Sequence, residues 1–448
     1  MTELNLGRLL IKNTGVQMIA QAVSLVIGLA MSLVLSRYLG VEGFGQFNYI
    51  FAFYYFFLTM NDFGVNTIVV REVSKHRERA GEIIGGMLSF KVLLAIFSVL
   101  MAWMVIWLMN FPESLRNSLY LFALILPLIA LQLPAVIFQV LLKVEYPAMI
   151  GIFDRCSGFI LLMGAVWLGY GLATTVLALL LSEFVSLLIT FKCARRFVRP
   201  TWRFEPRLWK EVLRSSLPLG IAGLFAALIN RVDFIMLERM TDLRQVGLYS
   251  AAYKVTSLLE AFPLMIMGTI YPLMSRYAHE DLGRLRALYK KAVLYLGVVA
   301  VPMGIGIMLL APAIIRILFG VQYSGADKGL MVLVWSTVFL YLAISGGNLL
   351  ISLGKEKVNL SILALGALVN IGLNLLWIPI MGFVGAALST AITFLIVLIG
   401  TTTAVRVYLP QGGHHEVGGV LSRCRVEIIG RESWPRGSSL AGPMKINE

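Results

Sequence analysis

The sequence predicts an all-α integral membrane protein with about twelve transmembrane helices, arranged in two parallel-repeat six-helix lobes around a central cavity. Of its 448 residues, 58% are hydrophobic and 14% are charged, whereas about a quarter of the residues of a soluble domain are charged. The apolar residues form runs of about twenty, the length with which a helix crosses a bilayer. A large soluble protein with buried helices would not show so many uninterrupted runs. A repeat between the two halves of the chain predicts the two lobes.

Twelve apolar runs define the expected spans. They are Thr14–Leu35, Gly45–Val70, Met87–Met109, Leu119–Leu141, Met149–Leu168, Thr174–Phe191, Ser215–Leu237, Val246–Leu273, Val293–Phe319, Leu330–Leu350, Val358–Ile380 and Gly382–Val405. Asn61, Asp62 and Gly64 interrupt the second run, which predicts a kink or break there. No small-residue cleavage site follows the first run, so we expect it to be retained as a span.

Basic residues are distributed unevenly between the two sides of the membrane. The loops of one side carry Arg37, Arg116, Arg239, Arg244 and Lys328, whereas those of the other side carry twenty-three Lys and Arg residues. Lys and Arg accumulate in cytoplasmic loops, so we expect a multi-pass protein of the cell membrane with both termini in the cytoplasm. The same bias explains the net charge of +14 without a nucleic-acid partner.

A basic stretch divides the chain into halves of similar size. We expect an N-terminal six-helix lobe at 1–191, a basic cytoplasmic linker at 192–214, a C-terminal six-helix lobe at 215–405 and a cytoplasmic, disordered tail at 406–448. The tail is rich in Gly, Ser and charge and has no apolar period, as is typical of disordered segments.

The linker admits two interpretations. Trp202 and Trp209 favour an interfacial helix that lies on the inner membrane surface, where its basic charge would bind anionic lipid. A solvated linker that only fixes the topology would have the same composition. Both interpretations stay open at this point.

Segments 37–51 and 239–253 resemble each other: RYLGVEGFGQFNYIF matches RMTDLRQVGLYSAAY, with Gly45 opposite Gly247. Six spans per half place the start of both copies on the same side, so the repeats are parallel and related by an axis along the membrane normal. Transporters with a substrate site between two such halves are a recurring design. A channel built from repeats would show a pore-loop sequence, and none is found.

The sequence carries no enzyme signature. It has no phosphate-binding loop ending in GK[ST], no HExxH and no GxSxG, so we expect no catalytic residues, no enzymatic activity and no cofactor. Cys156, Cys193 and Cys424 have neither a pairing pattern nor zinc-ligand spacing, and we expect no metal site.

Ionised and amide side chains inside the expected spans are the candidate functional residues, because such groups usually face an aqueous cavity or a partner. The candidates for substrate binding in the cavity are Arg231, Lys254, Arg155, Asn370 and Asn374, and those for coupling to H⁺ or Na⁺ are Asp233, Glu260, Glu183 and Asp62.

The competing interpretation is that these groups hold the helices together. Asp233 would then reach Lys254 across the hairpin, and Arg155 would pair with Glu183. We favour the cavity for Arg231 and Lys254. Structural pairing is favoured for Arg155 and Asp62, which lie near the inner interface.

Several of these stretches together resemble a known family: SRYLGVEGFGQFNYIFAF, NDFGVNTIVVREVSKHRE, NRVDFIMLERM and VGLYSAAYKV. They are similar to the bacterial polysaccharide-repeat-unit (O-antigen) flippase family, Wzx-like, of the multidrug/oligosaccharidyl-lipid/polysaccharide exporter superfamily. The resemblance covers residues 9–405 and rests on patterned positions, so it carries over no specific functional residue. The tail without further spans differs from the fourteen-span lipid II flippases.

The resemblance implies two lobes around a cationic cavity and transport by alternating access. The implied substrate is an oligosaccharide joined by pyrophosphate to a polyprenyl lipid, which moves from the inner to the outer leaflet for surface polysaccharide biosynthesis. The implied partners are this substrate, membrane lipid, a polysaccharide polymerase and glycosyltransferases.

Two other functions stay open. A cation-coupled multidrug exporter of the same fold would have a cavity of net acidic character with aromatic walls. A non-transporting scaffold of a polysaccharide assembly complex would use the basic linker.

Overall fold

The computed structural model describes residues 3–169 and 171–409, and the regular elements within these ranges are all helical. Residues Met1–Tyr408 form one compact unit. The last helix continues to Tyr408, three residues past the expected end of the second lobe. The rest of the stretch for which the sequence predicts a disordered tail, 410–448, lies outside the described residues.

The helices follow the expected order of spans. The first half contains α1 (Glu3–Asp62), α2 (Val65–Lys75), α3 (Ala80–Met109), α4 (Glu113–Phe122), α5 (Ile125–Leu131), α6 (Val136–Val140), α7 (Glu145–Leu168) and α8 (Gly171–Ala194). The second half contains α9 (Pro206–Met240), α10 (Leu243–Glu280), α11 (Leu282–Leu318), α12 (Ala326–Ser352), α13 (Glu356–Met381) and α14 (Phe383–Tyr408). Short 3-10 helices are η1 (Arg77–Arg79), η2 (Leu133–Ala135) and η3 (Val321–Tyr323).

The described residues contain 11 helical segments that are long and apolar enough to cross a membrane. The first, Gly15–Lys75, has 61 residues. As one straight helix it would be about 90 Å long, three times the hydrocarbon thickness of about 30 Å. Gly40 interrupts it with a non-helical backbone (φ 68°, ψ −173°). The segment therefore has the length of two spans, which gives twelve candidate spans in the described part of the chain. Each predicted span lies within an observed segment to within one residue.

The predicted break in the second span is confirmed. Helix α1 ends at Asp62 and α2 begins at Val65, and between them Phe63 and Gly64 have positive φ angles of 42° and 74°. Helix α9 packs against this break. The Phe63 ring occupies the space left by the missing side chain of Gly220.

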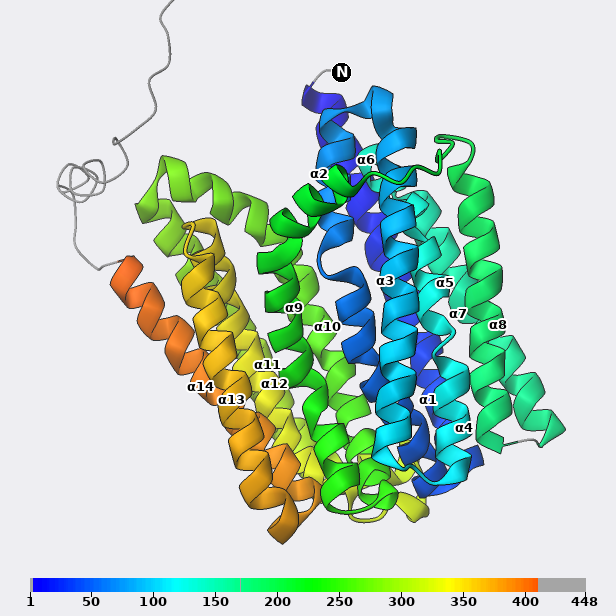
Figure 1. Cartoon of the computed structure of the whole chain (residues 1–448). Coiled ribbons are helices and arrows are strands. Elements are labelled where there is room, and N and C mark those ends of the chain that lie inside the picture. The colour runs from blue at the N-terminus through cyan, green and yellow to red at the C-terminus, as the bar shows by residue number, and fades with distance from the viewer. Residues whose placement is uncertain (1–2, 170, 410–448) are drawn as a thin grey trace, which may run out of the picture. The chain divides into compact units, whose positions relative to one another are not determined.

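The two halves form two lobes that Figure 1 shows side by side. Within the first half, α7 packs on α8 and α3 on α5; within the second, α12 packs on α10, α11 and α14. Helices α1, α9 and α10 join the halves, because α1 contacts both α9 and α10. The central space of the bundle is therefore bounded by α1 from the first half and by α9 and α10 from the second.

Residues 198–205 of the linker form an extended strap bound to α3, and α9 begins directly after it (Figure 1). The Thr201 amide donates to the carbonyl of Gly81 (3.1 Å), and the Trp209 indole donates to that of Gly86 (2.8 Å). A Cβ on Gly85 would overlap the backbone of Thr201. The glycines of α3 thus form a surface on which the backbone of the linker lies directly.

The linker therefore combines a strap with the start of a helix. Residues 198–205 have no helical structure, and Trp202 among them is 62% exposed. Trp209 lies in the first turn of α9 and packs on Phe90 with ring centroids 5.6 Å apart. A helix on the inner membrane surface stays a prediction for the part of the linker that lies in α9.

Candidate functional site

At one end of the bundle the two halves meet through their equivalent turns. A Cβ on Gly45 would overlap the carbonyl oxygen of Leu243, and a Cβ on Gly247 would overlap that of Val41. The two contacts are equivalent under the sequence repeat, because Gly45 corresponds to Gly247 and Val41 corresponds to Leu243. The backbones of α1 and α10 therefore touch directly, and this end of the central space is closed. Sequence analysis assigned this end to the outer face.

Two arginines at equivalent positions reinforce the closed end. The Arg37 guanidinium donates to the carbonyls of Ile317 (3.2 Å) and Leu318 (3.3 Å) at the end of α11. The Arg239 guanidinium donates to the carbonyl of Met109 (3.0 Å) at the end of α3. A cation at a helix C-terminus satisfies carbonyls that have no partner within the helix and interacts favourably with the helix dipole. Each arginine therefore binds a helix of the other half.

Toward the opposite end, a cavity of about 1340 Å³ lies between α1, α7 and α10. Its wall is built mainly from small and apolar side chains. Its polar lining residues are Gln17, Gln21, Ser24, Ser257, Glu260 and Thr269. The cavity lies near the start of α1 and the later part of α10, on the side that sequence analysis assigned to the cytoplasm. The central space is thus wide on this side and closed on the other.

Arg231 lies where the halves meet, inside a cage of aromatic rings. Its guanidinium carbon is 5.2 Å from the ring centroid of Tyr55 in the first half, and 5.7 Å and 5.3 Å from those of Phe234 and Tyr253 in the second. Cation–π contacts of this kind hold a desolvated guanidinium without neutralising its charge. The buried Nε atom of Arg231 has no hydrogen-bond partner. The arginine is held in place and keeps a donor free.

Lys254 lies near enough to Arg155 and Arg231 to be repelled by both, and Glu260 is attracted to Arg231. Of these four residues, Glu260 lines the cavity. Lys254 is one helical turn from the lining residue Ser257, and Arg155 is one turn from the lining residue Gly151. The three cations, which we call the basic cluster, therefore lie at the deep end of the cavity.

Asp233 does not pair with Lys254 and instead lies at the centre of a buried polar cluster in the second half. Its carboxylate accepts hydrogen bonds from Asn374 (2.6 Å), Tyr249 (2.6 Å) and Thr390 (2.5 Å). Asp233 is 2% exposed. The expected pair was wrong because Asp233 and Arg231, two positions apart, point to opposite sides of α9. The side of α9 that carries Asp233 faces the interior of the second lobe.

Asn370 and Asn374 share a face of α13, as their spacing predicts. The Asn374 amide donates to the Asn370 carbonyl oxygen (3.1 Å), and both residues are fully buried. They belong to the Asp233 cluster and not to the wall of the cavity. The Asn370 Nδ2 and Asn374 Oδ1 atoms have no partner, so the cluster contains an anion and an unused amide oxygen with no cation beside them.

Glu183 does not pair with Arg155 in the structure. It accepts a hydrogen bond from Gln132 (2.5 Å), whereas Arg155 is largely exposed. The local arrangement of α7 and α8 rests on Asp154, whose carboxylate accepts a hydrogen bond from Ser182 (3.1 Å). Arg155 interacts electrostatically with Glu183 without a direct ion pair, and it also interacts with Lys254.

Asp62 lies at the break after α1 and pairs with Lys91 of α3. The Lys91 ammonium is 3.2 Å from Asp62 and donates to the Asn66 side chain (2.9 Å). The Lys91 side chain is 1% exposed, against 44% for Asp62. Sequence analysis missed Lys91, although a single lysine within the apolar run MLSFKVLLAIF is a signal of such a pair.

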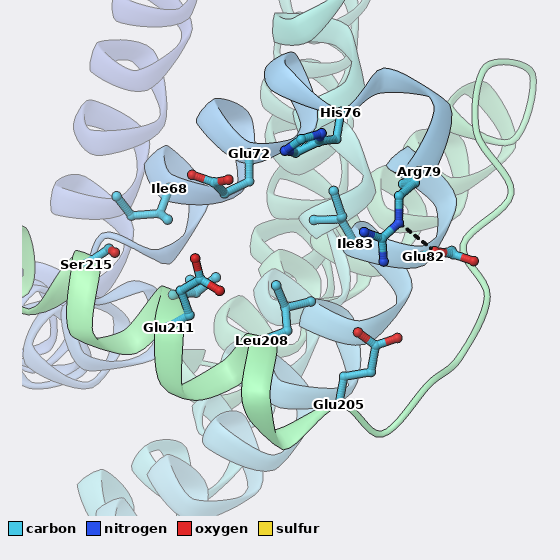
Figure 2. A pocket seen from close by; sticks show the side chains of 11 residues that line it. Ile68, Glu72, His76, Arg79, Glu82, Ile83, Glu205, Leu208, Glu211 and Ser215 are labelled. Atoms are coloured by element: carbon cyan, nitrogen blue, oxygen red, sulfur yellow. Dashed lines mark hydrogen bonds and ion pairs between the residues drawn. The ribbon is translucent and has the colours of Figure 1, made fainter. Parts of the chain in front are cut away.

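Figure 2 shows a second, smaller pocket of about 180 Å³ between α2, α3 and the start of α9. Its wall is acidic, and ion pairs hold its glutamates. Glu82 pairs with Arg79 (3.0 Å) and Arg203 (3.2 Å), and Glu72 pairs with Lys75 (3.1 Å). This pocket is an ionic contact between the linker and the first half, separate from the large cavity.

The chain is similar to known proteins in both sequence and fold. The profile of the family described as "Polysaccharide biosynthesis protein" matches residues 10–278. The chain is similar to a putative O-antigen transporter of Shigella flexneri, with 23% identity over 403 residues that cover 86% of this chain and 94% of that protein.

Two archaeal relatives match over shorter stretches. An uncharacterized membrane protein of Methanocaldococcus jannaschii is 26% identical over 216 residues, and a probable low-salt glycan biosynthesis flippase of Haloferax volcanii is 22% identical over 182 residues. The matched stretches span 42% and 38% of the length of these relatives.

Among solved structures, the fold is shared with the lipid II flippase MurJ in an inward closed conformation (TM-score 0.74, 15% identity, 87% of each chain). It is also shared with a multidrug resistance MATE family transporter in an inward-facing conformation (TM-score 0.68, 15% identity, 87% of this chain and 96% of that one). Both have the two-lobe fold described above. With a family profile that covers more than half of its length, the chain belongs to the polysaccharide biosynthesis protein family.

Proposed function

We propose that the protein is a flippase of the cell membrane. It moves a polyprenyl-pyrophosphate-linked oligosaccharide repeat unit from the inner to the outer leaflet, for surface polysaccharide biosynthesis. The observation that carries this proposal is the basic cluster of Arg155, Arg231 and Lys254, drawn from both halves at the deep end of the large cavity. Cations in excess of the carboxylates near them are expensive at this depth, and a phosphate anion is the ligand that guanidinium and ammonium groups bind well.

The shape of the cavity suits a substrate with a lipid tail. Helices α1 and α10 bound it, and both carry exposed apolar side chains beside it, among them Met18, Phe262 and Leu264. A polyprenyl chain would stay in the bilayer along these side chains while its polar head group enters the cavity. This arrangement avoids exposing the sugars and phosphates to hydrocarbon, where unsatisfied polar groups cost several kcal/mol each.

Transport by alternating access requires the closed end to open. The contacts at that end are backbone packing at Gly45 and Gly247 and the capping bonds of Arg37 and Arg239. The Phe44 ring also packs there against those of Phe319 (6.2 Å between centroids) and Tyr323 (6.1 Å) in the other half, so opening this end requires these rings to part. Their separation, together with closure of the wide end, would present the basic cluster to the outer face.

We further propose that Asp233 couples transport to a proton or Na⁺. The Asp233 cluster holds a buried carboxylate with only neutral donors and an amide oxygen without a partner, which suits a site that takes up and releases a cation. Asp233 and Arg231 lie two residues apart on α9, so a change at the cluster would shift Arg231. Glu260 is a second candidate because it lines the cavity, whereas Glu183 and Asp62 already have neighbouring partners.

The open alternatives predict different chemistry. A multidrug exporter would gather acidic groups in the cavity, whereas the described lining holds one, Glu260, and three cations lie beyond it. In the proposed pathway, glycosyltransferases would supply the substrate and a polysaccharide polymerase would use the product. A scaffold that does not transport would not depend on the basic cluster.

A complementation experiment tests the proposal. In a strain lacking the chromosomal gene, Arg231→Ala or Arg231→Glu should reach the membrane at the normal level and abolish export of the surface glycan. The matched control is Arg276→Ala, an exposed arginine whose partner is Glu280 (2.8 Å). Normal glycan from both Arg231 variants would contradict the proposal. Unchanged glycan with altered drug sensitivity would favour the exporter.

A further inference from the structure

The positive charge at the deep end of the cavity does not exceed what one pyrophosphate diester can neutralise. Three cations, Arg155, Arg231 and Lys254, have two carboxylates near them: Glu260 interacts with Arg231, and Glu183 interacts with Arg155. The excess is one positive charge. A pyrophosphate that joins a lipid to a sugar carries one negative charge on each phosphate, and therefore two. When such a group binds, no cation of the cluster remains for a further anion.

The rest of the cavity is neutral. Its lining contains no Lys or Arg among the described residues, and its other polar side chains are Gln17, Gln21, Ser24, Ser257 and Thr269. Amides and hydroxyls both donate and accept hydrogen bonds, which matches the hydroxyl and acetamido groups of uncharged sugars. These neutral groups carry no positive charge that would compensate a sugar carboxylate for the water it loses on binding.

Among the lining residues that the structure describes, Glu260 is the one that carries a charge. A uronic acid in the cavity would place a second carboxylate near it. Two like charges about 6 Å apart at an effective dielectric of about 20 repel each other enough to weaken binding about a hundredfold. A neutral sugar meets no such penalty, and an amino sugar would be attracted.

We infer that the repeat unit accepted by this cavity contains no acidic sugar, and that Glu260 is the residue that excludes acidic units. The inference rests on the proposed function and narrows it, because it assigns the pyrophosphate to the basic cluster and the glycan to the neutral wall. Specificity then comes from repulsion of the wrong substrate as well as from attraction of the right one.

The test uses the full chain in proteoliposomes with two polyprenyl-pyrophosphate oligosaccharides of equal length, one neutral and one in which a uronic acid replaces a single hexose. The wild-type protein should flip the neutral lipid at least about tenfold faster, which allows for partial screening of the repulsion. Glu260→Gln should reduce this ratio to near one by accelerating the acidic lipid. The matched control, Glu356→Gln, removes an exposed carboxylate at the start of α13 and should leave the ratio unchanged.

The outcomes separate the inference from the proposed function. Equal or faster flipping of the acidic lipid by the wild type would overturn the inference and leave the flippase intact. An unchanged preference in Glu260→Gln would overturn the role of Glu260. Failure of the wild type to flip either lipid would overturn the proposed function and the inference with it. The comparison of the neutral and the acidic lipid in the wild-type protein tests the inference even if a Glu260 variant folds poorly.

Discussion

Gly45 and Gly247 occupy equivalent positions of the two halves, and each lies against the backbone of the other half, Gly45 on Leu243 and Gly247 on Val41. Neither position has room for a Cβ, so the closed end depends on the absence of two side chains. The two equivalent glycine contacts thus lie at the end of the bundle where the halves would separate during the proposed transport.

Gly247→Ala should therefore weaken the closed end. The added Cβ overlaps the Val41 carbonyl, and such overpacking costs about 1–3 kcal/mol, which shifts the population toward the open form. The measurement is labelling of a cysteine introduced at Ser257, in a chain without its native cysteines, by a membrane-impermeant thiol reagent added from outside. Labelling should rise in the variant. Gly28→Ala, which adds a Cβ with nothing within 4 Å, is the control on α1, and equal labelling in both variants would argue against the steric closure.

Arg37 and Arg239 should act in the same direction. Replacing either by Gln removes a charged donor from helix-end carbonyls, and because both sites are exposed we expect a loss of about 1 kcal/mol each. The two effects should add, since the arginines cap different helices, α11 and α3. The same labelling assay should show a faster reaction for the double variant than for either single one. A double variant that labels like the wild type would exclude a role for these caps.

The strap on α3 predicts a local effect on the linker. Gly85→Ala would overlap the Thr201 backbone and should release the strap, making the peptide bond after Arg203 accessible to trypsin in vesicles with the cytoplasmic face outward. Gly86→Ala meets only the flexible end of Leu208 at 3.3 Å and should stay resistant. Cleavage at equal rates in both variants would show that the glycine surface does not hold the linker.

Much of this architecture is predictable from sequence, because bilayer thickness constrains span length and charge constrains orientation. The break at Gly64 and the pairing of Gly45 with Gly247 are also readable, since both depend on local residue type or on the repeat. The partners of Asp233 are not, because Thr390 lies 157 positions away and only packing of α9 against α14 brings it close. The linker strap is unpredictable for the same reason.

The candidate site was predicted in part. Sequence analysis grouped Arg231, Lys254 and Arg155 as candidates by charge alone; in the structure Lys254 interacts with both arginines, and none of the three is among the lining residues of the cavity. It placed Asn370 and Asn374 in the same group, but they belong to the Asp233 cluster. Spacing along a helix shows which residues share a face and does not show which neighbour that face meets.

Asp233→Asn should separate transport from its driving ion. The substitution keeps the size of the side chain and removes the charge that would take up a cation, so flipping should continue along the substrate gradient and lose its response to an imposed proton or Na⁺ gradient. Glu183→Gln is the control in the first half and should retain the response. A gradient response in Asp233→Asn equal to that of the wild type would place coupling elsewhere, with Glu260 as the next candidate.

The most direct test of the central claim is the rate at which the purified protein flips a neutral polyprenyl-pyrophosphate oligosaccharide in proteoliposomes, compared with the double variant Arg231→Gln/Lys254→Gln. Each charged hydrogen bond to phosphate contributes about 1.5–3 kcal/mol, so the double variant should be slower by about a hundredfold or more at equal amounts of folded protein. Flipping at the wild-type rate by the double variant would contradict the assignment of the pyrophosphate to the basic cluster.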